Sequence, residues 1–503
     1  MSSSSQTLVS DTRFARLARG TNAANWFWLP SKEPQPYKPQ DFAIMKSLGL
    51  TFVRLPIDFA TIYDAKSPSL LNTKALAKID AAIAQIQSYG LAVVVDLHST
   101  PGFLDDNDYS GALENPAFRQ VFINFWQSFA AHLGRTTNPE LTFLQPMNEP
   151  VFQSNPDAWA PIQTQLLQTI RASAPNHTLV AVSALWQNID TLITLQPLAD
   201  RNVVYDFHFY EPFVFTHQGA EWIDGYVQDL KQVPYPSTPQ NIQPLLQQFS
   251  GNPTAIADLT NYGAQQWNRN KVRQSIARAA KWASDNGVRL MSSEFGVYGK
   301  TAPAGDRVQW MADVRSAFEE FKIGWASWGY KGDFGYVDWK KNVPTLDAAM
   351  LQALGLNTTL QFNGTEKRDT LTGTSLADGL NGLGGNDLLS SYQGDDLLRG
   401  GNGRDRLLAG DGNDLLRGDK GVDLLIGGKG ADIFVLERRQ GLDRVQDFVN
   451  GVDRLGLLPG LTFKALTIWQ VGQNTQIGVG NEAIAVLLNT NAKTINAADF
   501  SAI

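Results

Sequence analysis

Short apolar runs alternate with longer amphipathic stretches along residues 15–350. The short runs have the length of buried strands and predict strands at 15–22, 49–55, 91–98, 141–148, 178–183, 202–209, 288–294 and 323–328. The longer stretches repeat apolar residues at i, i+3 and i+4, as Leu76, Ile79, Ile83 and Ile86 do. This spacing predicts helices at 73–89, 116–133, 156–173, 270–286 and 306–321.

Strand–helix alternation repeated eight times favours a (β/α)8 barrel, an α/β fold. A doubly wound open sheet is the alternative, because periodicity does not count strands reliably. The stretch 211–269 is rich in Pro, Gln and Asn, and we expect it to form an elaborated loop beside the active-site face of the barrel.

The pattern changes near residue 360. Twelve of the thirteen Trp residues precede this point, and Gly, Asp and Leu dominate after it. We therefore predict a catalytic barrel domain at 1–355, a linker at 356–363, a repeat domain at 364–455 and capping strands at 456–503.

A nine-residue repeat fills the predicted repeat domain, with Asp at 369, 378, 387, 396, 405, 414, 423 and 432 and an apolar residue two positions after each Asp. A fixed short period with glycine turns and inward Leu predicts a parallel β-roll, which is all-β. Stacked Asp carboxylates and carbonyls are hard oxygen ligands that suit Ca²⁺. Because these charges repel one another without the ion, we expect folding and calcium binding to be coupled. A metal-free solenoid is the alternative.

Composition narrows the classes of partner. The 503-residue chain has a net charge of −7 and no basic block, which argues against nucleic acid as a partner. No apolar run is long enough to span a bilayer, so we expect no membrane insertion. Cysteine is absent, which excludes disulfides and thiolate metal sites. The first residues lack the charged and apolar regions of a Sec signal peptide.

Polar residues gather at the carboxyl ends of the predicted strands, where a barrel carries its chemistry. They are Arg54, His98, Asn148, Glu149, His208, Tyr210, Glu294 and Trp328. Two of them are glutamates, and a pair of carboxyl groups flanking one bond is what glycoside hydrolysis requires.

Each of these residues alone has a simpler interpretation. Glu149 precedes Pro150 and could start a loop, Glu294 could pair with an arginine of the barrel, and His98 could be a core histidine. Their joint placement at strand ends favours the functional interpretation.

Six ordered motifs carry a resemblance to glycoside hydrolase family 5, the cellulase family, over residues 15–350. They are Arg-Leu-Pro at 54–56, Asp-Leu-His at 96–98, Met-Asn-Glu-Pro at 147–150, His-Phe-Tyr-Glu-Pro at 208–212, Ser-Glu-Phe-Gly at 293–296 and Trp-Gly-Tyr at 328–330. The resemblance implies retention of configuration, with no cofactor for catalysis. It also implies that Glu149 is the acid/base and Glu294 the nucleophile.

The same resemblance assigns the substrate-binding residues. Asn148 would bind the 2-hydroxyl of the sugar, and Arg54 and Tyr210 would hold the carboxylate of Glu294. His98 and His208 would line the subsite and Trp328 would stack beneath the sugar. Further aromatic residues that fit a sugar groove, or else pack in the core, are Trp26, Trp28, Phe213, Trp222 and Trp339.

The stretch 210–222 resembles bacterial endoglucanases of this family, which favours an endo-β-1,4-glucanase (cellulase) that acts on β-glucan polysaccharide. A β-mannanase or a β-1,3-glucanase of the same family is the alternative within the enzymes. A non-catalytic carbohydrate-binding or adhesion protein is the alternative from another class.

The repeats resemble the RTX, or hemolysin-type, calcium-binding repeat, most closely Gly-Gly-Asn-Gly-Arg-Asp at 400–405 and Gly-Gly-Lys-Gly-Ala-Asp at 427–432. The resemblance implies structural Ca²⁺ at Asp387, Asp396, Asp405, Asp414, Asp423 and Asp432. Repeats at Asp369 and Asp378 lack the glycines. RTX tails resemble substrates of type I secretion, so we expect an extracellular monomer that is exported without a Sec signal, with the secretion signal in 456–503.

Overall fold

The computed structural model describes residues 8–28, 36–99, 111–152 and 155–503. The chain forms two compact units. The first comprises Met1–Tyr336 and Gln352–Leu356, and the second comprises Val337–Leu351 and Asn357–Ile503. The segment Val337–Leu351 therefore groups with the repeats, although the predicted boundary at 355 placed it with the barrel. None of the helices in the described part of the chain combines the length and the apolar composition needed to cross a membrane.

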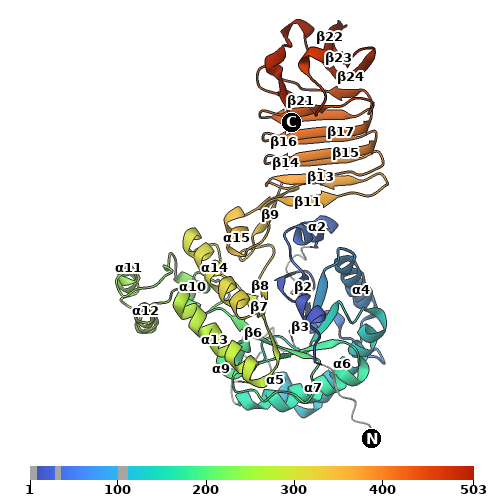
Figure 1. The fold of residues 1–503 in the computed structure, drawn as a ribbon. Coiled ribbons are helices and arrows are strands. Elements are labelled where there is room, and N and C mark those ends of the chain that lie inside the picture. The colour runs from blue at the N-terminus through green and yellow to red at the C-terminus, as the bar shows by residue number, and fades with distance from the viewer. Residues whose placement is uncertain (1–7, 29–35, 100–110, 153–154) are drawn as a thin grey trace. The chain divides into compact units, whose positions relative to one another are not determined.

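The first unit is a closed barrel of eight parallel strands, with β1 paired to β8 (Figure 1). The (β/α)8 prediction is confirmed, and closure excludes the open sheet. The strands are β1 Arg19–Asn22, β2 Phe52–Asp58, β3 Ala92–Ser99, β4 Thr142–Gln145, β5 Thr178–Val182, β6 Val203–Phe209, β7 Arg289–Phe295 and β8 Gly324–Ser327.

Helices pack against the outside of the barrel, as α4 (Thr73–Ser88) does against β3. In α4, Leu76, Ile79, Ile83 and Ile86 are all buried, as their spacing predicts. The helices are α1 Asp11–Ala15, α2 Pro39–Ser47, α3 Phe59–Ile62, α4 Thr73–Ser88, α5 Gly111–Glu114, α6 Pro116–Thr136, α7 Trp159–Ser173, α8 Ala184–Gln187, α9 Ile189–Leu192, α10 Phe213–Thr216, α11 Gln243–Gln248, α12 Pro253–Gln265, α13 Arg269–Asn286, α14 Ala304–Glu320 and α15 Ala348–Ala353. Each buried Leu or Ile contributes about 2 kcal/mol.

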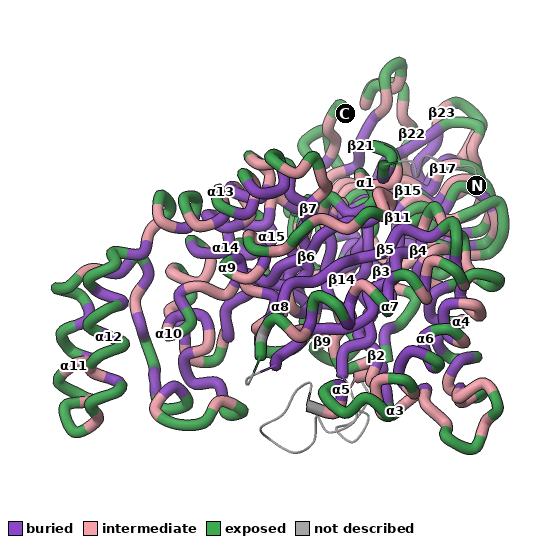
Figure 2. Tube along the Cα trace, turned by 90° about the horizontal axis from the view of Figure 1, so that it is seen from below, coloured by how far each residue is buried: buried purple, intermediate pink, exposed green. Residues whose placement is uncertain are grey.

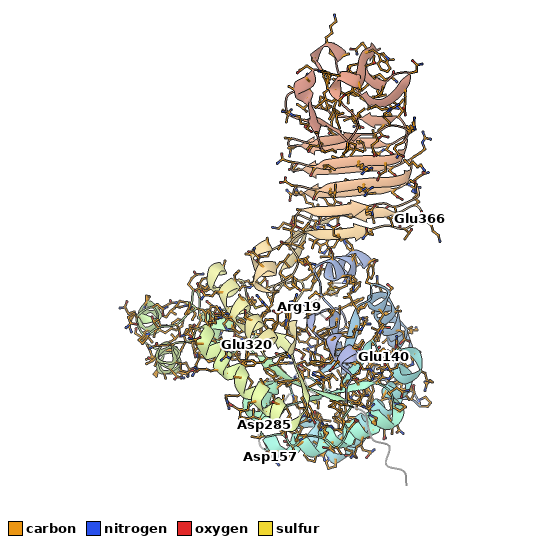
Figure 3. All side chains as sticks on the ribbon, in the orientation of Figure 1. Arg19, Glu140, Asp157, Asp285, Glu320 and Glu366 are labelled. Carbon is orange, nitrogen blue, oxygen red and sulfur yellow. The ribbon has the colours of Figure 1, made fainter. Side chains whose placement is uncertain are left out.

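Polar and apolar surfaces are sharply separated in this unit. The barrel strands are buried along their length, whereas the outer turns of helices such as α12 are exposed (Figure 2). The acidic side chains of Glu140, Asp285 and Glu320 lie on the outer elements and are exposed (Figure 3). Charged side chains inside the barrel are the exception that marks a site.

Two predicted segments differ from the structure. The stretch 211–269, expected to be one elaborated loop, contains α10, α11 and α12. Helix α12 begins where the side chain of Asn252 accepts a hydrogen bond from the N–H of Ala255. The first strand begins at Arg19, because Ser10 caps α1 and this helix takes Ala15.

The second unit is a roll built from two sheets that take alternate repeats (Figure 1). The seven-stranded sheet contains β11 Leu360–Asn363, β13 Asp378–Asn381, β15 Leu397–Gly403, β17 Leu415–Gly421, β19 Ile433–Leu436, β21 Arg454–Leu457 and β25 Phe500–Ala502. The eight-stranded sheet contains β12 Thr370–Thr372, β14 Leu388–Gln393, β16 Arg406–Asp411, β18 Leu424–Lys429, β20 Asp443–Val445, β24 Glu482–Leu487, β23 Asn474–Val479 and β22 Leu466–Val471.

Two repeats make one turn of the roll, so Leu398 pairs with Leu416, eighteen residues further on. Both side chains are fully buried. At Gly403, with φ of +146°, a Cβ would lie 1.4 Å from the carbonyl oxygen of Gly385, so the turns stack only with glycine there. The β-roll prediction is confirmed.

The ends of the roll refine the predicted bounds. Strand β11 lies inside the predicted linker 356–363 and pairs with β13, so part of that linker is the first strand of the roll. In the predicted capping region, β22, β23 and β24 pair in antiparallel fashion. Strands β9 Val337–Lys340 and β10 Val343–Leu346 form a separate hairpin.

Candidate active site

Arg54 is the centre of the polar network inside the barrel. It lies on β2 and its side chain has no exposed surface. Its guanidinium donates to Oε1 of Glu294 at 2.5 Å and to Oδ1 of Asn148 at 2.7 Å, and it forms an ion pair with Asp96 at 2.9 Å. Further bonds reach Gln145 and Asn22, each at 3.0 Å. A buried guanidinium with this many acceptors fixes several side chains in one geometry.

Glu294 lies near the end of β7, with its carboxylate held at both oxygens. Oε1 accepts from Arg54, and Oε2 accepts from the hydroxyl of Tyr210 at 3.0 Å. A cation on one oxygen and a hydroxyl donor on the other suit a carboxylate that acts as an anion. The side chain is 6% exposed, so water competes little for these bonds.

Glu149 follows β4 in a left-handed backbone conformation, with φ of 41°. Its N–H donates to Oε1 of Gln187 at 2.8 Å, and its Oε1 lies 2.7 Å from Nδ1 of His208. Burial raises the pKa of Glu149 to about 7. This carboxyl group therefore keeps its proton close to neutral pH, as a general acid must.

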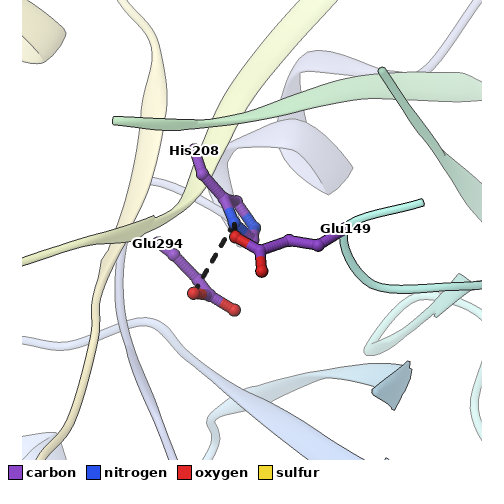
Figure 4. A group of neighbouring side chains, drawn as sticks. All are labelled: Glu149, His208 and Glu294. Carbon is purple, nitrogen blue, oxygen red and sulfur yellow. Dashed lines mark hydrogen bonds and ion pairs between the residues drawn. The ribbon is translucent and has the colours of Figure 1, made fainter. Parts of the chain in front are cut away.

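The carboxyl groups of the two glutamates lie near each other, both beside the ring of His208 (Figure 4). One carboxylate oxygen of Glu149, one of Glu294 and a ring nitrogen of His208 all lie within 4.8 Å of one another. Nδ1 of His208 is 3.5 Å from Oε2 of Glu294. Glu149 and Glu294 are 145 residues apart in the chain, and only closure of the barrel brings them together.

His98, Trp328 and Trp28 form an aromatic wall beside the carboxylates. The rings of His98 and Trp328 are stacked, with centroids 5.4 Å apart at 8°. Trp28 meets His98 edge-on at 4.6 Å. Nε2 of His98 lies 3.5 Å from the amide of Asn148, and its Nδ1 lies 2.7 Å from Asp96. All eight residues predicted at strand ends are thus gathered at one end of the barrel.

The other aromatic candidates divide between exposed and packed positions. Phe213 and Trp222 are 45% and 56% exposed. Trp26 packs against Tyr37 and Phe42 instead. Trp339 lies on β9, in the second unit.

Sequence reasoning missed the residues that support this set. Asp96 and Asp206 each precede a site histidine by two positions and are fully buried. Ser293 and Gln187 bond to Asp206 at 2.5 Å and 3.0 Å. The period of two in a strand was the available signal, because Asp96 and His98 share one face of β3 and Asp206 and His208 share one face of β6.

The roll carries a second set of buried carboxylates. The backbone N–H of one repeat Asp donates to Oδ1 of the Asp eighteen residues later, as from Asp387 to Asp405 and from Asp396 to Asp414, both at 2.8 Å. The six Asp residues predicted to bind calcium are all buried. Among the described residues, Oδ2 has no hydrogen-bond partner in Asp387, Asp396, Asp405, Asp414 and Asp423. Buried carboxylate oxygens without donors fit a hard cation.

The early repeats differ from this pattern. Oδ2 of Asp369 accepts from the N–H and hydroxyl of Thr365, and Oδ2 of Asp378 accepts from those of Thr374. These threonines supply donors where the later repeats supply none. At the other end, the N–H groups of Asp423 and Asp432 donate to carboxylates 20 and 21 residues later, at Asp443 and Asp453. The nine-residue period alone did not predict that Asp443 and Asp453 belong to the ladder of Asp residues.

Comparison with known proteins finds a family for each part of the chain. The model of the family Cellulase (glycosyl hydrolase family 5) matches residues 14–333, more than half of the chain. The RTX calcium-binding nonapeptide repeat model (4 copies) matches residues 363–398, 372–407 and 399–434.

Individual relatives are distant. Endoglucanase 3 of Fibrobacter succinogenes is 25% identical over 353 residues, covering 66% of this chain and 52% of that protein, so the chain spans about half the length of this relative. Endoglucanase C of Acetivibrio thermocellus is 27% identical over 293 residues, covering 58% of this chain and 83% of that protein. The solved structure of endoglucanase Cel5A from Thermotoga maritima superposes with a TM-score of 0.56 at 25% identity, covering 68% of this chain and 99% of its own. The chain therefore belongs to glycosyl hydrolase family 5, the cellulase family, and its barrel is followed by RTX calcium-binding repeats, as the sequence motifs indicated.

Proposed function

We propose that this chain is an endo-β-1,4-glucanase that cleaves internal bonds of β-glucan with retention of configuration. The observation that carries the proposal is the approach of a Glu149 oxygen and a Glu294 oxygen within 4.8 Å. Retaining glycosidases place their carboxyl groups about 5–5.5 Å apart, whereas inverting enzymes need roughly 6.5–9.5 Å to admit a water molecule. The glycosidic bond would lie between the two side chains.

The roles follow from the contacts of each carboxyl group. Glu294, held as an anion by Arg54 and Tyr210, attacks the anomeric carbon. Glu149 gives its proton to the departing glycosidic oxygen, so a covalent glycosyl ester forms as the old bond breaks. Glu149, now ionised, then removes a proton from water. The water oxygen displaces Glu294 from the anomeric carbon and Glu149 regains its proton.

Substrate binding draws on the neighbouring polar groups and rings. The amide of Asn148, oriented by Arg54, would bind the 2-hydroxyl of the sugar next to the scissile bond. The faces of Trp328 and Trp28 offer apolar surface for the C–H bonds of a pyranose. The two curated relatives described above carry the name endoglucanase, which supports β-1,4-glucan as substrate.

Hydrolysis assays with two variants test this proposal. We expect reducing ends from carboxymethylcellulose or mixed-linkage glucan, with less release from mannan and laminarin, and the β-anomer as the first product seen by ¹H NMR. Glu294→Gln and Glu149→Gln should each lose most activity, with a general acid worth about 10²–10⁴-fold. Glu140→Gln is the matched control, because Glu140 is exposed on an outer loop. Activity on mannan alone, or a Glu294→Gln variant as active as the parent, would contradict the proposal.

The roll is proposed to bind structural Ca²⁺ through the side chains of Asp387, Asp396, Asp405, Asp414, Asp423 and Asp432. The ion would supply the positive charge that the partnerless Oδ2 atoms of the first five residues lack. Extracellular calcium modules bind in the range of about 10⁻⁴–10⁻³ M, so the roll would fill outside the cell. Filling of the roll outside the cell supports an extracellular enzyme, and the RTX repeats support export by a type I apparatus. Deleting residues 456–503 should abolish export from a host with such an exporter, and normal export of that deletion would oppose the assignment.

A further inference from the structure

A closed ring of hydrogen bonds joins the side chain of Glu149 to its own backbone. Nδ1 of His208 lies 2.7 Å from Oε1 of Glu149, and Nε2 of His208 lies 3.1 Å from Oγ of Ser293. Ser293 Oγ donates to Oδ2 of Asp206 at 2.5 Å, and Gln187 Nε2 donates to the same oxygen at 3.0 Å. The N–H of Glu149 completes the ring by donating to Gln187 Oε1 at 2.8 Å.

The direction of each hydrogen bond follows from Asp206. Its Oδ1 accepts from the N–H of Ser293 at 2.8 Å, and its Oδ2 accepts from the amide nitrogen of Gln187. These nitrogens can only donate, so Asp206 is the acceptor. Burial raises the pKa of Asp206, and the charge of Arg54 together with the two hydrogen bonds from Ser293 opposes that rise. The hydroxyl hydrogen of Ser293 therefore points at Asp206.

A hydroxyl that donates to Asp206 must accept from its other neighbour. The neighbour of Ser293 Oγ is Nε2 of His208, so this nitrogen carries the hydrogen. In a neutral imidazole Nδ1 then presents a lone pair, and it faces Glu149. Burial lowers the pKa of His208, which favours the neutral ring.

We propose that Asp206 and Ser293 are positioning residues for the acid/base, because they fix the tautomer of His208 so that its Nδ1 accepts a hydrogen bond from the protonated carboxyl group of Glu149. The inference rests on the proposed acid/base role of Glu149. In this arrangement the protonated carboxyl gains a hydrogen bond that the ionised carboxylate would lose. The ring of hydrogen bonds thus holds the proton on Glu149 until the glycosidic oxygen takes it.

Gln187 ties the same carboxylate to the backbone of the acid/base. Leu185, Trp186 and Gln187 have φ of 47°, 58° and 54°, three successive left-handed residues that are not glycine. Such a run is unfavourable and persists only where the surroundings hold it. The amide of Asn188 donates to the carbonyl of Leu185 at 2.9 Å, and the two bonds of Gln187 hold the other end. The turn directs Gln187 inward, to where Glu149 also adopts a left-handed φ.

A serine pair on β7 gives a matched test. Ser293 and Ser292 are adjacent and fully buried, but the hydroxyl of Ser292 donates to the carbonyl of Glu294 at 3.3 Å and is outside the ring. The ionisable groups that face Glu149 and His208 are Arg54, Asp96, His98, Asp206, Tyr210 and Glu294. Ser293→Ala removes none of them, so a change in the pH profile reports the hydroxyl.

The experiment measures kcat against pH on a soluble cello-oligosaccharide, together with ¹⁵N NMR of labelled histidines, of which the chain has five. We expect the alkaline limb of Ser293→Ala to move to lower pH by about one unit. Ser292→Ala should match the parent, and Ser293→Thr should restore the limb. In the parent, His208 should be the Nε2–H tautomer, and Asp206→Asn should shift it towards Nδ1–H.

Two results would overturn the proposal: coincident alkaline limbs for Ser293→Ala and Ser292→Ala, or an Nδ1–H tautomer of His208 in the parent. If Ser293→Ala does not fold, the tautomer in the parent decides alone. Failure of the proposed function looks different. A fully active Glu149→Gln variant would remove the acid/base role but leave the tautomer of His208 as measured.

Discussion

Replacing Asp414 by asparagine is expected to stabilise the roll without calcium and to weaken it with calcium. Oδ1 of Asp414 accepts from the N–H of Asp396 at 2.8 Å, a bond that the asparagine oxygen keeps. Oδ2 is buried and has no hydrogen-bond partner among the described residues. The substitution therefore removes the charge and a proposed calcium ligand while leaving the ladder of hydrogen bonds in place.

The magnitude follows from the pKa of Asp414, which burial raises from 3.8 to about 7. Without calcium, the folded roll binds a proton on the Asp414 carboxyl group more tightly than the unfolded chain does. The stability of the calcium-free roll therefore falls as pH rises from about 4 to about 7. A shift of about three units corresponds to about 4 kcal/mol, and screening by nearby solvent reduces this to about 2 kcal/mol. Calcium would replace the proton and cancel this cost.

Calorimetry of the full chain, stripped of metal, measures how the substitution changes the unfolding of the roll. The unfolding transition of the roll is identified as the one that added calcium shifts. Without calcium, the pH at which the roll unfolds at a fixed temperature should be higher in Asp414→Asn than in the parent. At pH 7.5, more calcium should be needed to restore the transition. Asp395→Asn is the matched control, because Oδ1 of Asp395 accepts from the N–H of Asn413 at 2.7 Å but the residue is exposed. A parent roll whose calcium-free stability does not fall with rising pH would refute this reasoning.

Three further predictions concern the barrel. Activity should fall by half near pH 7 and about tenfold per unit above it, because the pKa of Glu149 is raised to about 7 and the acid must be protonated; a flat profile from pH 6 to 9 would contradict this. Arg54→Met should lower the free energy of unfolding by about 3–5 kcal/mol in urea titrations, since it leaves the buried carboxylates of Glu294 and Asp96 without their cation, and an unchanged midpoint would argue against that network. Trp328→Ala should raise KM about tenfold on cello-oligosaccharides with a smaller effect on the melting temperature, because the ring is proposed to bind sugar; an unchanged KM would remove it from the groove.

Local patterns predicted the strands and helices, because strands and helices depend mainly on residues that are close together in the chain. The strand predicted at 91–98 is Ala92–Ser99 in the structure, and the one at 178–183 is Thr178–Val182. Each is an apolar run of a length that suits a strand buried on both faces. In the tail, the nine-residue period predicted the inward positions of Leu398 and Leu416, since each repeat occupies the same place in a turn.

The eight residues at strand ends were also within reach of the sequence, because a parallel barrel sets all carboxyl ends at one edge. The contacts that these residues make with their partners were not. Asp206 and Ser293 are 87 residues apart, and Gln187 reaches Glu149 from a turn with three successive left-handed residues. No local period encodes such contacts.

The sequence by itself thus determined the alternation of strand and helix, the repeat and the pair of glutamates, all of which depend on spacing along the chain. Only the tertiary structure decided which oxygen of each carboxyl group is bonded, which side chains contact Glu149, and that the Asp ladder continues to Asp443 and Asp453. The physical reason is that a hydrogen bond depends on a distance and a direction in space, which the chain acquires when the barrel closes and the turns of the roll stack.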